Sequence, residues 1–298
     1  MRGFVIRTIK NKNKKKINYN YHNETGKKLK SFKEKFYIPP AYKYVKINRN
    51  KNAKVLAIAK DDKNRSQYIY NKKFLKKNKK NNFKNLYNFG LNFEKIKNKI
   101  ENDIKLNNNL SDIALILYLI MNCNIRIGNK KYTKNNNSYG ASTLEKKHFQ
   151  IKDNKLYLSF KGKKKVINDC IIENQMIINI FKNKLKKKDK LFNINNYEIN
   201  SYLKQFGDIT SKDIRTWNAN ILFIKYLINN KLNIIENDLK NAISYVSFEL
   251  HNSPSVVKKE YIDPRLFKFY EKNKNKFINY FKNKNINKNY LSFLKKYI

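Results

Sequence analysis

Arginine is rare in this chain, and its few arginines are candidates for binding phosphate. Of the 67 lysines and arginines only seven are arginine, so lysine fills almost every position where positive charge alone is enough. A guanidinium is planar, permanently charged and offers a fork of donors that fits two phosphate oxygens at once, whereas an ammonium is a point charge. Arg126, in the segment Ile125–Asn129, and Arg215, in the segment Lys212–Asn220, are therefore candidates for phosphate chemistry.

The sequence lacks the motifs of metal-dependent or ATP-driven phosphoryl chemistry. His22, His148 and His251 are scattered, no glycine-rich phosphate loop is present, and no Asp/Glu/Cys cluster has the spacing of metal ligands. A metal-dependent nuclease or an ATP-driven motor needs such groups. We therefore expect no metal and no cofactor.

Four segments carry the polar residues that remain of interest. They contain Arg126, Lys163, Arg215, and the pair Asn252 and Tyr261. Each residue alone has an ordinary structural explanation: a lone arginine is usually a surface charge, most tyrosines pack in cores, and Lys163 lies in a run of lysines. Their order along the chain becomes informative only when it is compared with that of a known family.

In these segments the chain resembles a type IB DNA topoisomerase of the short kind found in poxviruses, giant viruses and bacteria. The resemblance runs from about residue 37 to residue 270 and includes Tyr37-Ile38-Pro39-Pro40. It implies that Tyr261 attacks a DNA phosphodiester and forms a 3′-phosphotyrosyl link without ATP. It further implies that Arg126 and Arg215 stabilise the transition state and that Lys163 protonates the leaving 5′-oxygen.

The residue before Ser253-Pro254 departs from part of that family. Asn252 stands where the poxvirus enzymes have histidine, and His251 stands one residue earlier. Asparagine can donate a neutral hydrogen bond to a phosphate oxygen but carries no charge. We expect Asn252 to contact the scissile phosphate, and the sequence leaves His251 open as the alternative.

The resemblance also implies residues that grip DNA. In an extended strand Arg65 and Gln67 share one face while Tyr68 and Tyr70 share the other. The family places this strand in the major groove, where Gln and Arg side chains can read base edges. The residues that match positions near the scissile phosphate are Lys131, Tyr132 and Lys212.

Apolar periodicity predicts an α+β protein with a small N-terminal β-sheet domain, residues 1–78, and a larger, mainly helical catalytic domain, residues 79–298. Short β-branched or aromatic runs predict strands at 44–47, 55–59 and 67–70. The lysine and asparagine tract at 71–85 fits either a linker or the start of a solvated helix. Apolar residues at three- and four-residue spacing predict helices at 91–104, 111–123, 171–185, 196–206, 210–229, 235–250 and 264–282. A hairpin signal at 145–167, with Asp153-Asn154 at its turn, interrupts them.

Composition favours a nucleic-acid partner; an acidic membrane surface could also attract this charge, but no long basic amphipathic helix supports it. The formal net charge of +45 gives strong attraction to duplex DNA, and the longest apolar run, Ile113 to Met121, is too short to cross a membrane. Cys123 and Cys170 are too few for a disulfide framework, and we expect them to be buried small hydrophobes in a reduced compartment. We expect a soluble intracellular monomer, in the cytoplasm, the nucleus or a virion, that closes as a clamp on DNA.

Two other functions compete with the topoisomerase hypothesis. A tyrosine recombinase uses the same nucleophile and two arginines, but it places histidine three residues before the second arginine, where this chain has Lys212. A noncatalytic basic DNA-binding protein needs none of the catalytic residues, whereas every catalytic position here is filled by a competent side chain.

Overall fold

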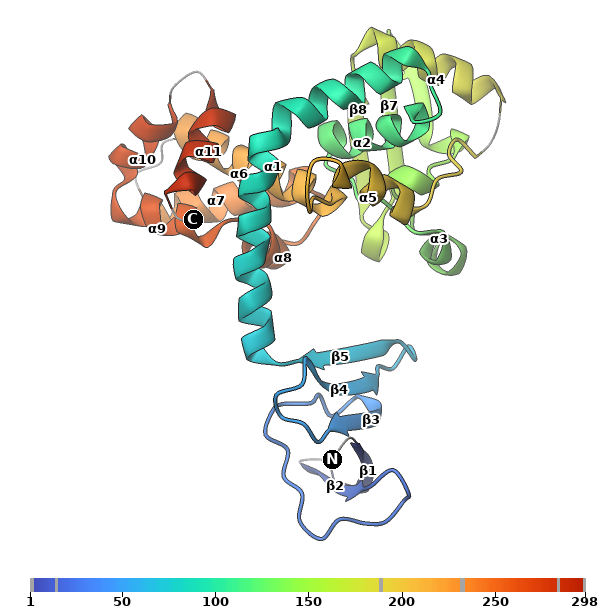
Figure 1. The fold of residues 1–298 in the computed structure, drawn as a ribbon, viewed down its shortest axis with the longest axis vertical. Coiled ribbons are helices and arrows are strands. Elements are labelled where there is room, and N and C mark those ends of the chain that lie inside the picture. Colours follow the sequence, from blue (N-terminus) through green and yellow to red (C-terminus); the bar gives the residue numbers. More distant parts are fainter. Residues whose placement is uncertain (1–2, 14–15, 188–189, 231–233, 283–284, 297–298) are drawn as a thin grey trace. The chain divides into compact units, whose positions relative to one another are not determined.

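The chain forms two compact units, Met1–Asn82 and Phe83–Ile298 (Figure 1). The structure is a computed structural model that describes residues 3–13, 16–187, 190–230, 234–282 and 285–296. One antiparallel sheet lies in the first unit, and the second unit is mainly helical with a smaller sheet. The predicted α+β class is therefore confirmed, and the sequence had suggested a boundary near residue 78.

The first unit is a five-stranded antiparallel sheet in the order β2-β1-β3-β4-β5. Its strands are β1 (Phe4–Asn13), β2 (Lys16–His22), β3 (Lys43–Asn48), β4 (Val55–Lys60) and β5 (Ser66–Tyr70). Alternate residues of β3 and β4 point inward, so Val45 and Ile47 pack with Ala57 and Ala59 in a small core. The three predicted strands are confirmed as β3, β4 and β5, and β1 and β2 are additions to that prediction.

The lysine and asparagine tract belongs to a long helix, α1 (Lys72–Leu106). Of the two interpretations of this tract, the helical one is therefore correct. The later part of α1 buries Leu86, Phe89, Ile96 and Ile100 in the core of the second unit. Their spacing of three, four and seven residues is that of one helical face.

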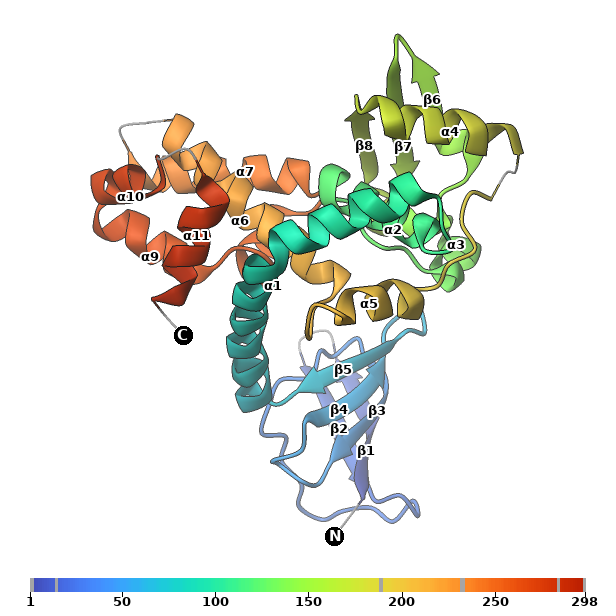
Figure 2. The same ribbon diagram turned by 45° about the horizontal axis from the view of Figure 1, so that its top comes forward.

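The second unit surrounds one continuous hydrophobic core. Its helices are α2 (Ser111–Cys123), α3 (Lys130–Asn136), α4 (Gln175–Lys187), α5 (Asn196–Lys204), α6 (Ser211–Asn229), α7 (Ile235–Glu249), α8 (Pro254–Glu260), α9 (Pro264–Lys272), α10 (Lys274–Phe281) and α11 (Ile286–Lys295). Its strands β6 (Phe149–Lys152), β7 (Lys155–Lys161) and β8 (Ile167–Ile172) form an antiparallel sheet in that order. Within this unit the small sheet lies with α2 and α4, while α9, α10 and α11 gather at the other end (Figure 2).

The predicted hairpin is confirmed, with differences on either side of it. Asp153 and Asn154 connect β6 to β7 in left-handed conformations, φ 49° and 54°, as a tight hairpin turn requires. The predicted helix at 171–185 begins late, because residues 171 and 172 pair with β7 as part of β8. The predicted helix at 264–282 divides at Asn273, whose side chain accepts a hydrogen bond from the Lys276 N–H and so starts α10.

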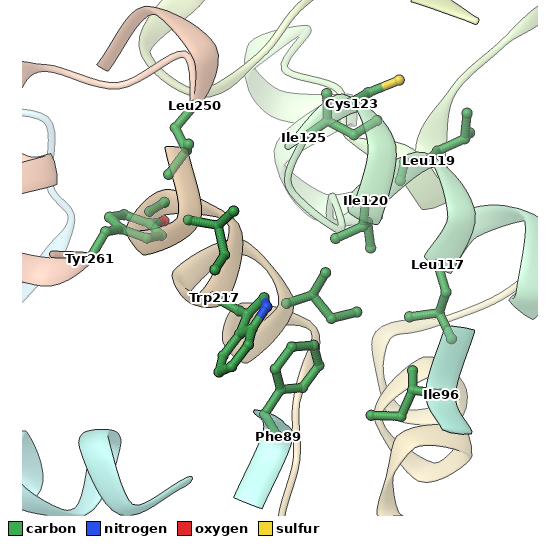
Figure 3. Close-up of a cluster of buried hydrophobic side chains, with 14 of the residues drawn as sticks. Phe89, Ile96, Leu117, Leu119, Ile120, Cys123, Ile125, Trp217, Leu250 and Tyr261 are labelled. Atoms are coloured by element: carbon green, nitrogen blue, oxygen red, sulfur yellow. The ribbon is translucent and has the colours of Figure 1, made fainter. Parts of the chain in front are cut away.

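Helix α6 occupies the middle of the second unit, packed against α2, α7, α10 and α11. Its Trp217 is only 1% exposed, and the indole ring contacts Phe89, Phe93 and Tyr290. Figure 3 shows Trp217 and Phe89 in this cluster. A Cβ on Gly90 of α1 would stand 2.5 Å from the indole, so glycine is needed where α1 crosses Trp217. Trp217 therefore fixes the rotation of the helix that carries Arg215.

The expectation for the cysteines was wrong. Cys123, at the end of α2, and Cys170, on β8, form a disulfide with Cα atoms 5.5 Å apart. The two residues are 47 positions apart in sequence, and only the packing of β8 against α2 brings them together. The side chains are therefore a covalent link and not two free, buried thiols.

Two further features were searched for in the described part of the chain. No helix there combines the length and the apolar character that a bilayer crossing needs. No group of three or more His, Cys, Asp and Glu side chains there is arranged to hold a metal ion.

Candidate active site

Arg215 lies in the second turn of α6 and is held by three hydrogen bonds. A capping box starts the helix, with the Thr210 N–H donating to the Asp213 carboxylate at 2.8 Å. The Arg215 Nε donates to the Asn124 carbonyl at 2.8 Å, and Nη2 donates to the Leu250 carbonyl at 2.9 Å. Nη1 donates to the Tyr261 hydroxyl at 2.8 Å. The guanidinium is thus fixed by two backbone carbonyls and aimed at a phenol.

Burial strengthens the electrostatic interaction of the Arg215 charge with nearby groups. The side chain is 4% exposed, and burial, followed by repulsion from Arg126, lowers the pKa of Arg215 to about 10. The group still carries its charge at neutral pH. A fixed cation from which water has been removed interacts more strongly with a developing negative charge than a solvated cation does.

Tyr261 follows the short helix α8 and is positioned from both its ring and its backbone. Pro254 occupies the first turn of α8, where its fixed φ suits a helix start. The Tyr261 ring is 6% exposed, and the guanidinium carbon of Arg215 lies 5.2 Å from the ring centroid. The Tyr261 carbonyl accepts a hydrogen bond from Asn220 Nδ2 at 2.9 Å. Figure 3 shows Tyr261 beside Leu250 at the edge of the core.

Arg126 lies on the turn that follows α2, and two glycines shape that turn. Gly128 has φ 93°, and a Cβ on Gly140 would stand 2.5 Å from the Gly128 nitrogen. This close approach lets the Ala141 N–H donate to the Arg126 carbonyl at 2.8 Å. The side chain of Arg126 then donates through Nη2 to Oδ1 of Asn252. Gly128 and Gly140 therefore fix the backbone of Arg126.

Asn252, not His251, joins the arginines. Asn252 accepts from Arg126 and donates through Nδ2 to the Leu250 carbonyl at 3.1 Å, the same carbonyl that Arg215 contacts. His251 has a left-handed backbone, φ 50°, and burial together with the charge of Arg215 lowers its pKa. Its ring makes no hydrogen bond within the described residues. The two arginines, Tyr261 and Asn252 thus form one connected group around the Leu250 carbonyl.

Lys163 stands apart from this group. It is exposed on the turn between β7 and β8 (Lys163–Lys165), where Lys164 has φ 63°. A Cβ on Gly162 would meet the Asn168 amide at 2.5 Å, so the turn packs tightly at its base. In the part of the chain that the structure describes, no hydrogen bond links Lys163 to the arginines, to Tyr261 or to Asn252. The turn therefore presents Lys163 to solvent.

The residues expected near the scissile phosphate are also at the surface of the second unit. Lys131 and Tyr132 lie on α3, and Tyr132 is 61% exposed. Lys212 is exposed in the first turn of α6, one turn before Arg215. These side chains are free of the core and accessible to a ligand.

In the first unit, β5 separates the expected grip residues onto two faces. Tyr68 and Tyr70 are exposed, with ring centroids 6.3 Å apart. Gln67 donates to Asp61 at 2.9 Å, and Arg65, which precedes the strand, donates to the same carboxylate oxygen at 2.8 Å. Those bonds, that of Arg65 first, lower the pKa of Asp61 to about 2. Asp61 therefore orients both polar side chains.

The sequence interpretation missed several members of these groups. The carbonyls of Asn124 and Leu250 carry no sequence signal, because every residue has a carbonyl. Asn220, on α6, carried no signal of its own among the many asparagines of the chain. Asp61 was not singled out, although a carboxylate close to Arg65 in sequence was a visible clue.

Comparison with known proteins supplies the family. A model of the eukaryotic DNA topoisomerase I catalytic core matches residues 71–287. The chain belongs to the type IB DNA topoisomerase family. The residues from α1 to the start of α11, including the whole group around Leu250, lie inside that match.

The chain is similar to several viral members of the type IB topoisomerase family. The chain is 29% identical to DNA topoisomerase 1B of Acanthamoeba polyphaga mimivirus over 270 residues, which cover 82% of this chain and 80% of the relative. It is 27% identical to DNA topoisomerase 1B of vaccinia virus over 180 residues, 57% of this chain and 56% of the relative. The match to DNA topoisomerase 1 of rabbit fibroma virus is 21% over 275 residues, 88% and 87% of the two chains. The predicted resemblance to a short viral type IB topoisomerase, and with it the enzyme class, is confirmed.

Proposed function

We propose that this type IB topoisomerase relaxes supercoiled duplex DNA through a covalent tyrosine intermediate. The Tyr261 oxygen attacks the phosphorus of one strand and the bond from phosphorus to the 5′-oxygen breaks, which leaves a 3′-phosphotyrosyl link and a free 5′-hydroxyl. The phenolic proton is lost and the 5′-oxygen gains one. Because one phosphoester replaces another, the step needs neither ATP nor a metal, and the 5′-hydroxyl can reverse it.

The contact between Arg215 and the Tyr261 hydroxyl, 2.8 Å, is the observation that carries this proposal. The donor at that distance holds the attacking oxygen beside a fixed cation, where the scissile phosphate must also lie. A guanidinium has five N–H donors, so two remain beside the three bonds that Arg215 makes here. Those donors can meet the nonbridging phosphate oxygens, whose charge grows in the transition state.

Arg126 and Asn252 would complete the same phosphate site. Their mutual hydrogen bond keeps both side chains near Arg215 until a phosphate oxygen replaces the partner. Asn252 then supplies a neutral donor and Arg126 a charged one. Two cations and an amide suit a transition state whose extra charge is spread over two oxygens.

We assign the general acid role to Lys163. Lys163 is exposed on the turn between β7 and β8, so bound duplex can contact it. We propose that this contact brings its ammonium to the leaving 5′-oxygen. Protonation of the 5′-oxygen turns an alkoxide, a poor leaving group, into a hydroxyl.

DNA binding is proposed for both units. Tyr68 and Tyr70 offer exposed aromatic faces, while Arg65 and Gln67, oriented by Asp61, would read base edges. Lys131, Tyr132 and Lys212 would contact the backbone near the cleavage site. We propose that one copy of the chain closes as a clamp on duplex DNA and that the cut strand rotates about the intact one. Such a substrate implies an intracellular place of action.

Relaxation of plasmid DNA tests the proposal. Supercoiled plasmid incubated in EDTA without ATP should be relaxed by the natural chain and not by Tyr261→Phe, while both retain DNA affinity. Tyr226→Phe, at the other end of α6, serves as the matched control and should relax normally. Denaturation during the reaction and digestion should leave nucleotide on the peptide that contains Tyr261. Relaxation by Tyr261→Phe would reject the assignment, retarded but supercoiled plasmid would indicate a binding protein, and strand exchange between two sites would indicate a recombinase.

A further inference from the structure

Helix α6 holds a single residue, Asn124, with two of its side chains. The Arg215 Nε donates to the Asn124 carbonyl at 2.8 Å, and Asn218 Nδ2 donates to Asn124 Oδ1 at 2.9 Å. Asn218 Nδ2 also donates to the carbonyl of Met121 at 2.6 Å. Residues three apart lie on one helical face, so Arg215 and Asn218 grip the end of α2 together.

Asn124 has the conformation that makes its carbonyl available to Arg215. It follows the last residue of α2 in a left-handed conformation, φ 52° and ψ 23°. Asparagine tolerates this region better than other residues that bear a Cβ. A left-handed residue turns the chain out of the helix, which reorients its carbonyl away from the helix axis. The side chain is held at the same time, since Asn124 is only 8% exposed.

The contact of Asn218 with Met121 completes the connection. The last carbonyls of a helix lack intrahelical partners, and Met121 is within the last turn of α2. By bonding both Met121 and Asn124, the Asn218 amide joins the helix end to the left-handed residue. Side chains of α6 therefore donate to three oxygens of this turn: the carbonyls of Met121 and Asn124 and the side-chain oxygen of Asn124.

We propose that Asn218 is a positioning residue for cleavage, which acts on Arg215 through Asn124. The plane of the Arg215 guanidinium is fixed by two carbonyls, those of Asn124 and Leu250. If the Asn124 carbonyl moves, the plane keeps one fixed point and can pivot about it. Nη1 then loses its aim at Tyr261. Asn218 itself touches neither DNA nor the reacting atoms in this scheme.

This inference rests on the proposed role of Arg215 in cleavage, and a double-mutant cycle tests it. Single-turnover formation of the covalent adduct is measured at saturating duplex for the natural chain, Asn218→Ala, Arg215→Ala and the double variant. We expect Asn218→Ala to slow the adduct by about 10-fold or more with DNA affinity within about 2-fold, because small displacements of a catalytic group are costly. In the Arg215→Ala background the same change should cost less than about 2-fold. Asn122→Ala, which removes an exposed asparagine of α2 whose amide bonds the carbonyl of Tyr118, is the matched control and should match the natural chain.

Two variants of Asn124 keep the test decisive even if Asn218→Ala does not fold. Asn124→Gly removes the bond to Asn218 but adopts the left-handed conformation freely, whereas Asn124→Ala loses both the bond and the conformation. We expect the alanine variant to slow the adduct several-fold more than the glycine variant. Equal rates for these two, full activity of Asn218→Ala, or losses that add in the double variant would overturn the inference. Absence of any adduct from the natural chain would instead reject the proposed function.

Discussion

Asn220 holds the backbone that runs from the proposed nucleophilic residue, Tyr261, to Asp263. Its Nδ2 donates to the Tyr261 carbonyl at 2.9 Å, and its Oδ1 accepts from the N–H of Asp263 at 2.8 Å. Asn220 is 0% exposed, so neither backbone group has water to replace the amide. The same helix, α6, thus carries Arg215, which contacts the phenol, and Asn220, which fixes the main chain of that phenol.

Asn220→Ala should therefore weaken both folding and cleavage. Two backbone groups lose their buried partner, at a cost of about 1–3 kcal/mol each when left unsatisfied. We expect the free energy of unfolding to fall by about 2–4 kcal/mol and adduct formation to slow about 10-fold as Tyr261 loses its fixed position. Denaturant titration and single-turnover cleavage measure the two effects. Asn229→Ala, at the exposed end of α6, is the control, and a folded Asn220→Ala chain that cleaves at the natural rate would contradict the assignment.

Substitution of Lys163 should have an effect that depends on the leaving group. Lys163→Ala is expected to slow cleavage of an ordinary phosphodiester by about 100-fold or more, within the usual range for a general acid. A substrate whose 5′-oxygen is replaced by sulfur has a leaving group of low pKa that needs no proton. On that substrate the variant should cleave nearly as fast as the natural chain.

The neighbouring Lys164→Ala provides the control for the lysine run, since it removes a charge from the same turn. It should cleave both substrates at close to the natural rate. If Lys163→Ala slows the oxygen and sulfur substrates equally, Lys163 acts by binding or orientation and the acid lies elsewhere.

The spacing of apolar residues was enough to predict those helices and strands in which it follows one regular period. Helix α2 and strands β3 to β5 were predictable because apolar residues recur at regular spacing. Strand β1 was not predicted, because its Arg7 points inward, is only 6% exposed and pairs with Glu34. A buried ion pair breaks the alternation by which a strand is recognised.

The candidate site, in contrast, depends on tertiary contacts that local sequence patterns do not reveal. Side-chain candidates such as Arg126, Arg215 and Tyr261 came from a resemblance spread over the chain, and no spacing alone would have joined them. Their alignment depends on the carbonyls of Asn124 and Leu250, which have no residue signature. The Cys123–Cys170 link was missed for the same reason, since 47 residues separate its ends and only folding brings them together.

Reduction of the Cys123–Cys170 disulfide should destabilise the second unit. A crosslink that closes a loop of 47 residues removes unfolded-state entropy equivalent to about 4 kcal/mol in the chain-entropy model. Denaturant unfolding of this unit with and without dithiothreitol should show a loss of that order. The Cys170→Ser variant should resemble the reduced protein and ignore the reductant. An unfolding midpoint that reductant leaves unchanged in the natural chain would contradict the prediction.

Arg215→Lys should make cleavage depend on pH in a range where the natural residue does not titrate. Burial lowers the pKa of Arg215 to about 10, which leaves it charged throughout an assay from pH 6.5 to about 9. A lysine begins near pKa 10.4, and the same burial would lower it toward neutrality. The variant ammonium therefore loses its proton as the pH rises, whereas a guanidinium keeps its own.

The ratio of the variant rate to the natural rate isolates this effect, because the titration of all other groups is common to both proteins. We expect the ratio to fall as the pH rises from 6.5 to 9, by about 10-fold for each pH unit above the lysine pKa. Single-turnover adduct formation at saturating DNA measures it. A ratio that stays constant over that range would mean that charge at position 215 does not govern the rate, and the cationic role assigned to Arg215 would be lost.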